Sequence, residues 1–198
     1  MSPSPSDIQL DALREVANIG CGHAVNALAR LVGSRPVNLS VPRAVLAVAP
    51  EVAELLGGGD APVVAAKLGI EGQLRGVLLL VLPTEAGAAL ESLLLRREDA
   101  PVEERESALS EAANIAASAC LSAIGTLTGW KLLPTVPVLV RGVAGAVVSG
   151  AVTEAEGDNR VVVLETRFSA AGAPAVSGQM LLVFERESSK ALLARLGV

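Results

Sequence analysis

Apolar residues recur every three to four positions in two long stretches, one from Asp7 to Gly33 and one that starts near Pro101. This spacing is typical of an amphipathic helix that buries one side. At 100° per residue, the apolar positions of the first stretch fall within a sector of about 120°. We predict two buried helix sides: Leu13, Val16, Ala17, Gly20, Ala24, Ala27, Leu28 and Leu31 in the first, and Leu109, Ala112, Ala113, Ala116, Cys120, Ala123, Ile124 and Leu127 in the second.

The first helix has recognisable start and stop signals. Ser6, with Gln9 three residues later, resembles a capping box, and Asp7 suits the positive end of a helix dipole. Gly33 supplies a stop.

Shorter apolar runs joined by Gly-rich turns predict strands. They lie at Val37–Val48, Val63–Ile70 and Leu74–Leu82, and again at Pro134–Val140, Ala144–Thr153, Arg160–Phe168 and Met180–Phe184. Each group is followed by a short helical pattern, at Thr84–Leu95 and at Ser188–Leu196. Because short turns favour antiparallel pairing, the predicted class is α+β, a mainly antiparallel sheet with two long helices packed on it.

The two long helical stretches are also copies of each other. When Asp7–Ser34 is aligned with Glu103–Trp130, nine of the 28 positions are identical. A repeat of this length indicates duplication within one pseudo-two-fold domain rather than a solenoid. We therefore expect a single domain over residues 1–198, made of homologous halves at about 7–100 and 101–198.

Composition excludes several classes of protein. Hydrophobic residues make up 51% and charged residues 19%, the reverse of a disordered chain. The only aromatic residues are Phe168, Phe184 and Trp130, and the net charge is -5. A nucleic-acid partner is therefore not expected. Cys21 and Cys120 have neither metal-ligand nor disulfide-framework spacing, and we interpret them as inert cytosolic thiols.

No membrane insertion is expected, although the mean hydropathy is +0.52. The longest uninterrupted apolar run, Val77–Leu82, is far shorter than the roughly 18 residues that a span needs. The first residues, Met1–Asp7, lack the basic and apolar regions of a signal peptide. The expected location is the cytoplasm.

A polar stripe lies opposite the buried side of each long helix. Its members are Asp11, Glu15, Asn18, Gly22 and Asn26 in the first helix, and Ser107, Glu111, Asn114, Ser118 and Ser122 in the second. Asn is a mediocre helix former, yet both copies place it three residues after Glu and among small residues. The small neighbours leave the stripe flat enough for another surface to approach. The alternative is that these are ordinary solvated residues, kept passively since the duplication.

These stripes carry a family resemblance. Asp11-Ala-Leu-Arg-Glu15-Val-Ala-Asn18-Ile-Gly20-Cys-Gly22-His-Ala24 resembles the first signature of the CheC-type chemotaxis phosphatases (CheC, CheX and FliY), and Ser107-Ala-Leu-Ser-Glu111-Ala-Ala-Asn114-Ile resembles the second. The family pattern places a Pro about 22 residues after the Asn. Pro137 fits that count, whereas Pro42 lies one residue late. The presence of two signatures resembles the CheC branch of the family, and the resemblance extends over the whole chain.

The resemblance implies a hydrolase that removes the aspartyl phosphate of the response regulator CheY. In this family the Asn enters the regulator's active site and orients the attacking water, and the Glu pairs with a Lys of the regulator. Carried over, the catalytic residues are Glu15, Asn18, Glu111 and Asn114. The residues expected to dock the regulator are Asp11, Gly22, Ser107 and Ser118.

The resemblance also implies partners and cofactors. The chain needs no cofactor or metal of its own, because the regulator carries Mg²⁺. Members with two signatures usually act as monomers, often with CheD, a glutamine deamidase, as a partner. The chemistry is plausible from first principles, because an amide can both accept from and donate to a water, and positioning alone can supply about 10²-fold.

Other readings of the sequence stay open. The chain could be an adaptor that binds a receiver domain or a CheD-like deamidase without catalysis, or a phosphatase with one working site. Elsewhere, His23 is expected to pack at the edge of the core, and Gly57–Asp60 is expected to be a turn rather than a phosphate loop. The charged run Glu103–Glu106 is expected to be solvated.

Overall fold

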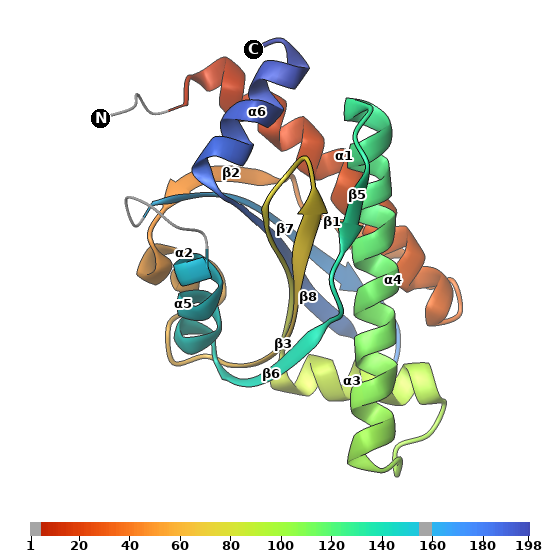
Figure 1. The fold of residues 1–198 in the computed structure, drawn as a ribbon. Helices are drawn as coiled ribbons and strands as arrows, with labels where there is room; N and C mark the ends of the chain where they lie inside the picture. The colour runs from red at the N-terminus through yellow and green to blue at the C-terminus, as the bar shows by residue number, and fades with distance from the viewer. Residues whose placement is uncertain (1–4, 155–159) are drawn as a thin grey trace.

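An antiparallel sheet separates two layers of helices (Figure 1). The computed structural model describes residues 5–154 and 160–198. The order helix–strand–strand–helix–strand–strand–helix occurs twice along the chain. The first series is α1 (Asp7–Leu31), β1 (Val37–Leu39), β2 (Arg43–Ala47), α2 (Ala49–Leu55), β3 (Pro62–Gly72), β4 (Gly76–Pro83) and α3 (Thr84–Leu95). The second is α4 (Val102–Thr128), β5 (Leu132–Pro134), β6 (Val138–Val143), α5 (Ala144–Glu154), β7 (Val161–Ala170), β8 (Val176–Phe184) and α6 (Arg186–Leu196).

The two series exchange strands within one sheet. The strand order is β1-β7-β8-β4-β3-β5, with β2 also paired to β7 and β6 also paired to β3. The first series meets the second at the β4–β8 pair, where Leu79 lies opposite Leu181. The short strands of each series pair with a long strand of the other. The pairs are antiparallel, which confirms the predicted α+β class.

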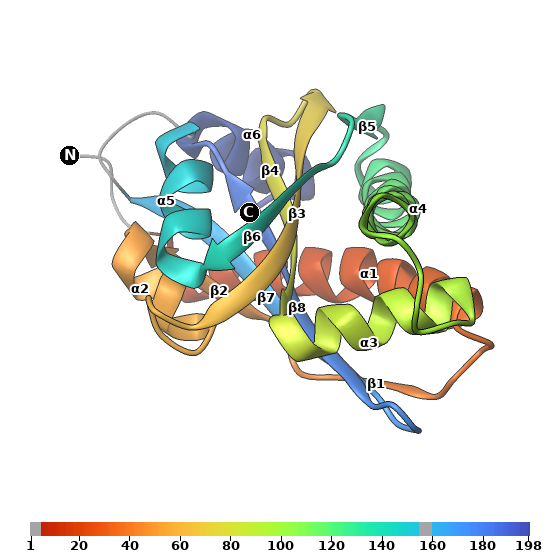
Figure 2. The same cartoon turned by 90° about the horizontal axis from the view of Figure 1, so that it is seen from below.

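Each face of the sheet has its own hydrophobic core (Figure 2). The larger core lies under α1 and α4 and contains Leu13, Leu109 and Phe184. The smaller one lies under α2 and α5 and contains Val52 and Val147. Because both faces are covered, β4 is a continuous apolar run rather than an alternating one.

The two long helices form where the apolar spacing predicts them. The capping box at α1 is confirmed: Gln9 N donates to Ser6 Oγ at 3.3 Å, and Ser6 N donates to Gln9 Oε1 at 3.0 Å. Most of the predicted buried positions are buried, but Leu31 and Leu127 are 36% and 44% exposed. Both lie in the last turns of their helices.

α4 also passes the length and composition test for a membrane-spanning helix. However, 56% of its apolar stretch is buried inside the molecule, mainly by packing against α1 and the sheet. Its apolar character is therefore explained by its place in the core.

Three predictions of secondary structure are wrong. The predicted strand Ala144–Thr153 is the helix α5, whose buried residues Ala144, Val147, Val148 and Ala151 follow helical spacing. The helix α2 was not predicted, because its seven residues are few and include Pro50. The predicted strands Val37–Val48 and Pro134–Val140 each correspond to two short strands, because a turn interrupts them at residues 40–42 and 135–137.

Candidate functional site

The stripe on α1 faces solvent. Asp11, Glu15 and Asn18 are exposed, and Gly22 is half-buried, with open space where a Cβ would lie. Asp11 forms an ion pair with Arg14, one helical turn away. In contrast, no group among residues 5–154 and 160–198 bonds the side chains of Glu15 or Asn18. These two groups are therefore available to a partner.

The stripe on α4 repeats this arrangement with differences in exposure at two positions, Asn114 and Ser118. Ser107, Glu111 and Ser118 are exposed, whereas Asn114 is half-buried. Within the described part of the chain, neither Glu111 nor Asn114 has a side-chain hydrogen bond or ion pair. The structure thus presents the same Glu and Asn pair twice, on two helices.

α1 and α4 pack against each other through the sides that lie opposite the stripes. A Cβ on Gly20 of α1 would lie 2.9 Å from Cys120 Sγ and 3.1 Å from Ile124 Cδ1 of α4. Gly20 lies about 140° around its helix from Glu15, and Cys120 about 180° from Glu111. The two stripes therefore point in different directions, each away from the contact between α1 and α4.

The helix pair is held together by a buried thiol contact. Cys21 and Cys120 are both fully buried and reduced. The neighbouring Cys21 thiol and burial together raise the pKa of Cys120 well above its ordinary value of 9.0. The same contact lowers the pKa of Cys21. Both thiols are buried in the core, as the spacing of Cys120 predicts, and they support the stripes by packing.

A hollow of about 500 Å³ adjoins the stripe on α4. One wall consists of Ser118, Ser122 and Thr126 of α4, and the opposite wall includes Leu133 and Pro134 of β5. Ser118 and Ser122 belong to both the hollow and the stripe. The surface next to Asn114 is therefore not flat along its whole length, contrary to what the small residues suggest.

Two matching turns beside the helices were missed by the sequence analysis. Ser40-Val41-Pro42 joins β1 to β2, and Thr135-Val136-Pro137 joins β5 to β6. The tripeptides are related by an offset of 95, whereas the helices are related by 96, so an ungapped comparison hides them. This single residue is also why Pro42 lies one position late. A gapped comparison of the two halves would have revealed both turns.

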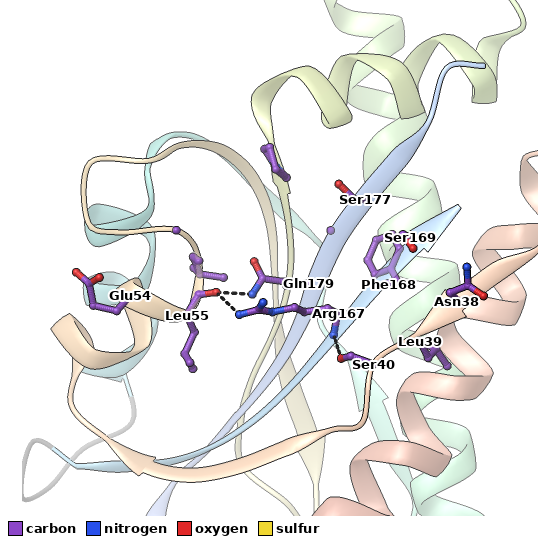
Figure 3. A pocket seen from close by; sticks show the side chains of 14 residues that line it. Asn38, Leu39, Ser40, Glu54, Leu55, Arg167, Phe168, Ser169, Ser177 and Gln179 are labelled. Carbon is purple, nitrogen blue, oxygen red and sulfur yellow. Dashed lines mark hydrogen bonds between the residues drawn. The ribbon is translucent and has the colours of Figure 1, made fainter. Parts of the chain in front are cut away.

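A second cavity, of about 540 Å³, lies away from both stripes, at the end of α2 (Figure 3). Two of its lining side chains bind the buried Glu165 carboxylate: Gln179 Nε2 donates to Glu165 Oε1 at 2.9 Å, and also to the Leu55 carbonyl at 2.5 Å. Arg167 Nε donates to the same Glu165 oxygen at 2.9 Å. Because Glu165 is only 1% exposed, this network compensates a buried charge and ties the end of α2 to the sheet.

The structure also shows the environment of the other residues that the sequence singled out. His23 is exposed, so the prediction that it packs at the core edge is wrong. The Gly run after α2 is a turn, as predicted, with Gly57 and Gly58 at positive φ. The charged run at the start of α4 is not simply solvated, because Glu104 pairs with Arg97, Arg105 approaches Glu91, and Glu106 approaches Arg141. Among the described residues, no group of three His, Cys, Asp or Glu could hold a metal ion.

Comparison with known proteins adds an independent line of evidence. The sequence model of the CheC-like family matches residues 8–46, the segment that holds the α1 stripe. The chain is 32% identical to "CheY-P phosphatase CheC" of Bacillus subtilis over 197 residues, which is 96% of this chain and 94% of that protein.

Solved structures match the fold along nearly its whole length. Thermotoga maritima FliY superposes with a TM-score of 0.77 at 19% identity, covering 98% of each chain. CheX from a Borrelia burgdorferi complex with CheY, BeF₃ and Mg²⁺ superposes with a TM-score of 0.54 at 13% identity, covering 86% of this chain and 97% of that one.

Proposed function

This chain belongs to the CheC-like family, and on that premise we propose that it is a phosphatase for the aspartyl phosphate of a CheY-type response regulator in chemotaxis signalling. One observation carries the proposal. Two long helices each present a Glu and, three residues later, an Asn, and neither side chain has a bonding partner among residues 5–154 and 160–198. Support comes from the B. subtilis relative, whose name assigns it CheY-P as substrate, and from the CheX structure solved together with CheY.

In this proposal, Asn18 and Asn114 orient the attacking water. The amide oxygen accepts a hydrogen bond from the water, and the amide NH₂ donates to a phosphoryl oxygen or to the water. The water oxygen attacks phosphorus in line with the bond to the aspartate. That P–O bond breaks, the aspartate carboxylate leaves, and inorganic phosphate is released. Because an acyl phosphate is already activated, positioning of about 10²-fold is sufficient.

Glu15 and Glu111 anchor the regulator. Each lies three residues before its Asn, which places both side chains on the same side of the helix. An exposed carboxylate without an internal partner can pair with a Lys at a protein contact, and such a pair fixes the register of docking. Asp11, Gly22, Ser107 and Ser118 extend the contact along each helix.

The proposal takes Mg²⁺ from the regulator, where it neutralises the phosphoryl oxygens. The chain itself contributes the amide, the carboxylate and the docking surface. It acts as a monomer in this proposal, since one chain holds both stripes, and a CheD-like deamidase is a further partner.

A non-catalytic adaptor for a receiver domain or a CheD-like deamidase is the second candidate. One observation favours it: no group in the described part of the chain holds either Asn amide, whereas catalytic groups are usually fixed by their neighbours. In the phosphatase, the regulator must therefore complete the positioning of the amide.

The test combines hydrolysis with binding. Phosphate release from a phosphorylated CheY-type receiver with Mg²⁺ is measured for the parent and for Asn18→Ala/Asn114→Ala. The phosphatase predicts acceleration by the parent, loss of acceleration in the double variant, and retained binding of the receiver by both. Asn38→Ala, an exposed Asn on β1, is the control and should match the parent. Binding by the parent without acceleration, across several receivers, would establish the adaptor instead.

A further inference from the structure

Val41 and Val136 are the most exposed large hydrophobic side chains among the described residues. They are 83% and 82% exposed, respectively. A single exposed Val needs no explanation. Here, however, two equivalent positions of a duplicated fold both leave a Val in water, in the matching tripeptides Ser40-Val41-Pro42 and Thr135-Val136-Pro137.

Each turn is held by the same pair of hydrogen bonds. Ser40 N donates to the Arg167 carbonyl at 2.9 Å, and Arg167 N donates to Ser40 Oγ at 3.0 Å. Thr135 N donates to the Gly69 carbonyl at 2.9 Å, and Gly69 N donates to Thr135 Oγ1 at 2.8 Å. The hydroxyl residue thus clamps each turn to a long strand, and the Pro restricts the backbone on its other side. A preorganised apolar side chain loses little entropy on binding.

Both turns lie beside the helices that carry the stripes. β1 and β2 contact α1, and β5 and β6 contact α4, so the turn between each pair of strands runs along its own helix. Figure 1 shows β5 running alongside α4 before β6 turns away toward α5. These strands form the outer margins of the sheet, which leaves the turns accessible.

We propose that Val41 and Val136 are apolar docking contacts for the receiver domain, one beside each Glu/Asn stripe. This inference rests on the proposed function and deepens it. The partner surface that fits is an apolar patch within reach of a lysine, because each stripe offers a carboxylate and each turn offers a Val. In this arrangement the valines increase the affinity for the receiver, and the Glu fixes the position in which it docks. The Asn is the only one of these residues that takes part in hydrolysis.

One site must be isolated for the test. In the Asn114→Ala background only the α1 site can react, and Val41→Asp is introduced there; Val136→Asp is introduced in the Asn18→Ala background. The proposal predicts a KM about tenfold higher in each case, with kcat within twofold of the matching background. A tenfold change corresponds to about 1.4 kcal/mol, close to the burial of one Val side chain. An unchanged KM overturns the proposal.

Control variants separate docking from folding. Val102→Asp changes another exposed Val, on the side of α4 opposite Glu111, and should leave KM unchanged. If an Asp variant melts earlier than the parent, Val41→Thr and Val136→Thr replace it, since Thr keeps the shape of Val.

Direct binding distinguishes this inference from the proposed function. If the parent binds a beryllofluoride-loaded receiver without accelerating hydrolysis, the proposed phosphatase fails, but a tenfold weaker Kd for Val41→Asp/Val136→Asp still supports the docking role. An unchanged Kd, or no binding by the parent, overturns it. Loss of self-association or of CheD binding, with receiver affinity unchanged, would assign the turns to those partners and also overturn it.

Discussion

Gly20 of α1 lies directly against Cys120 of α4, so that a Cβ on Gly20 would be 2.9 Å from the Cys120 sulfur. This contact sets how closely the two long helices approach. Because it lies opposite Glu15 and Glu111, it also fixes the directions in which the two stripes point. The glycine in the first signature therefore has a packing role, separate from the chemistry of its neighbours.

Substitution of Gly20 by Val should destabilise the protein. The added methyl groups would overlap Cys120 and Ile124, and overpacking of this kind costs about 1–3 kcal/mol. Urea unfolding checks this. The matched control is Gly22→Ala, where a Cβ meets nothing within 4 Å and where helix propensity should add up to about 1 kcal/mol. Equal stability of the Gly20→Val variant and the parent would contradict the packing role.

Replacement of Glu15 and Glu111 by Gln should weaken docking and spare the chemistry. Loss of a carboxylate–lysine pair predicts a KM about three- to tenfold higher, with kcat within twofold and with less dependence on salt. Steady-state phosphate release at two ionic strengths measures this. Glu85→Gln, at the exposed start of α3, is the control. If kcat falls steeply while KM stays constant, the Glu acts as a general base and the anchoring role is wrong.

The buried Cys120 thiol should make the protein less stable at alkaline pH. The raised pKa of Cys120 keeps its thiol protonated in the folded state above pH 9, whereas the unfolded thiol ionises there. The unfolded state then binds fewer protons, so the stability present below about pH 9 declines as the pH rises further. Cys120→Ala should lessen the decline in the free energy of unfolding between pH 8.5 and 10. An identical decline in both proteins would refute this origin.

Two ion pairs, one with a buried carboxylate and one exposed, should contribute differently to stability. Glu91 of α3 is 1% exposed and accepts a hydrogen bond from Arg141 Nη2 at 2.6 Å, with Arg105 farther away at 3.9 Å. Arg141→Gln should cost about 1–3 kcal/mol of stability, less than for a fully buried pair because Arg141 is partly exposed. Lys190→Gln breaks a solvent-exposed pair with Glu187 and should cost less stability than Arg141→Gln. Urea unfolding of both variants tests this ranking, and equal losses would contradict it.

The sequence predicted those helices and strands whose apolar spacing agrees with only one type of secondary structure. The two long helices follow from apolar spacing over many turns, and α3 was predicted at its observed bounds, Thr84–Leu95. α5 was mistaken for a strand because Val-rich composition favours strands, although its buried residues recur at helical spacing. Strand exchange between the halves could not be predicted, because it depends on contacts between residues about 60–133 positions apart.

The site was only partly visible in the sequence. Glu15 and Glu111, with their Asn partners, could be identified because they recur where packing does not require them. The opposite directions of the two stripes depend on the contact of Gly20 with Cys120, which no periodicity specifies. Val41 and Val136 were hidden by the one-residue difference in the loops before β1 and β5.

The most direct test of the account compares four proteins in one assay: the parent, Asn18→Ala, Asn114→Ala and the double variant. Each is mixed with a phosphorylated CheY-type receiver and Mg²⁺, and phosphate release above the receiver's own rate is measured. Since the two stripes face different directions, the rates of the single variants should add up to that of the parent, and the double variant should give no acceleration. Acceleration that survives in the double variant would contradict the assignment of the Glu/Asn stripes as the catalytic sites.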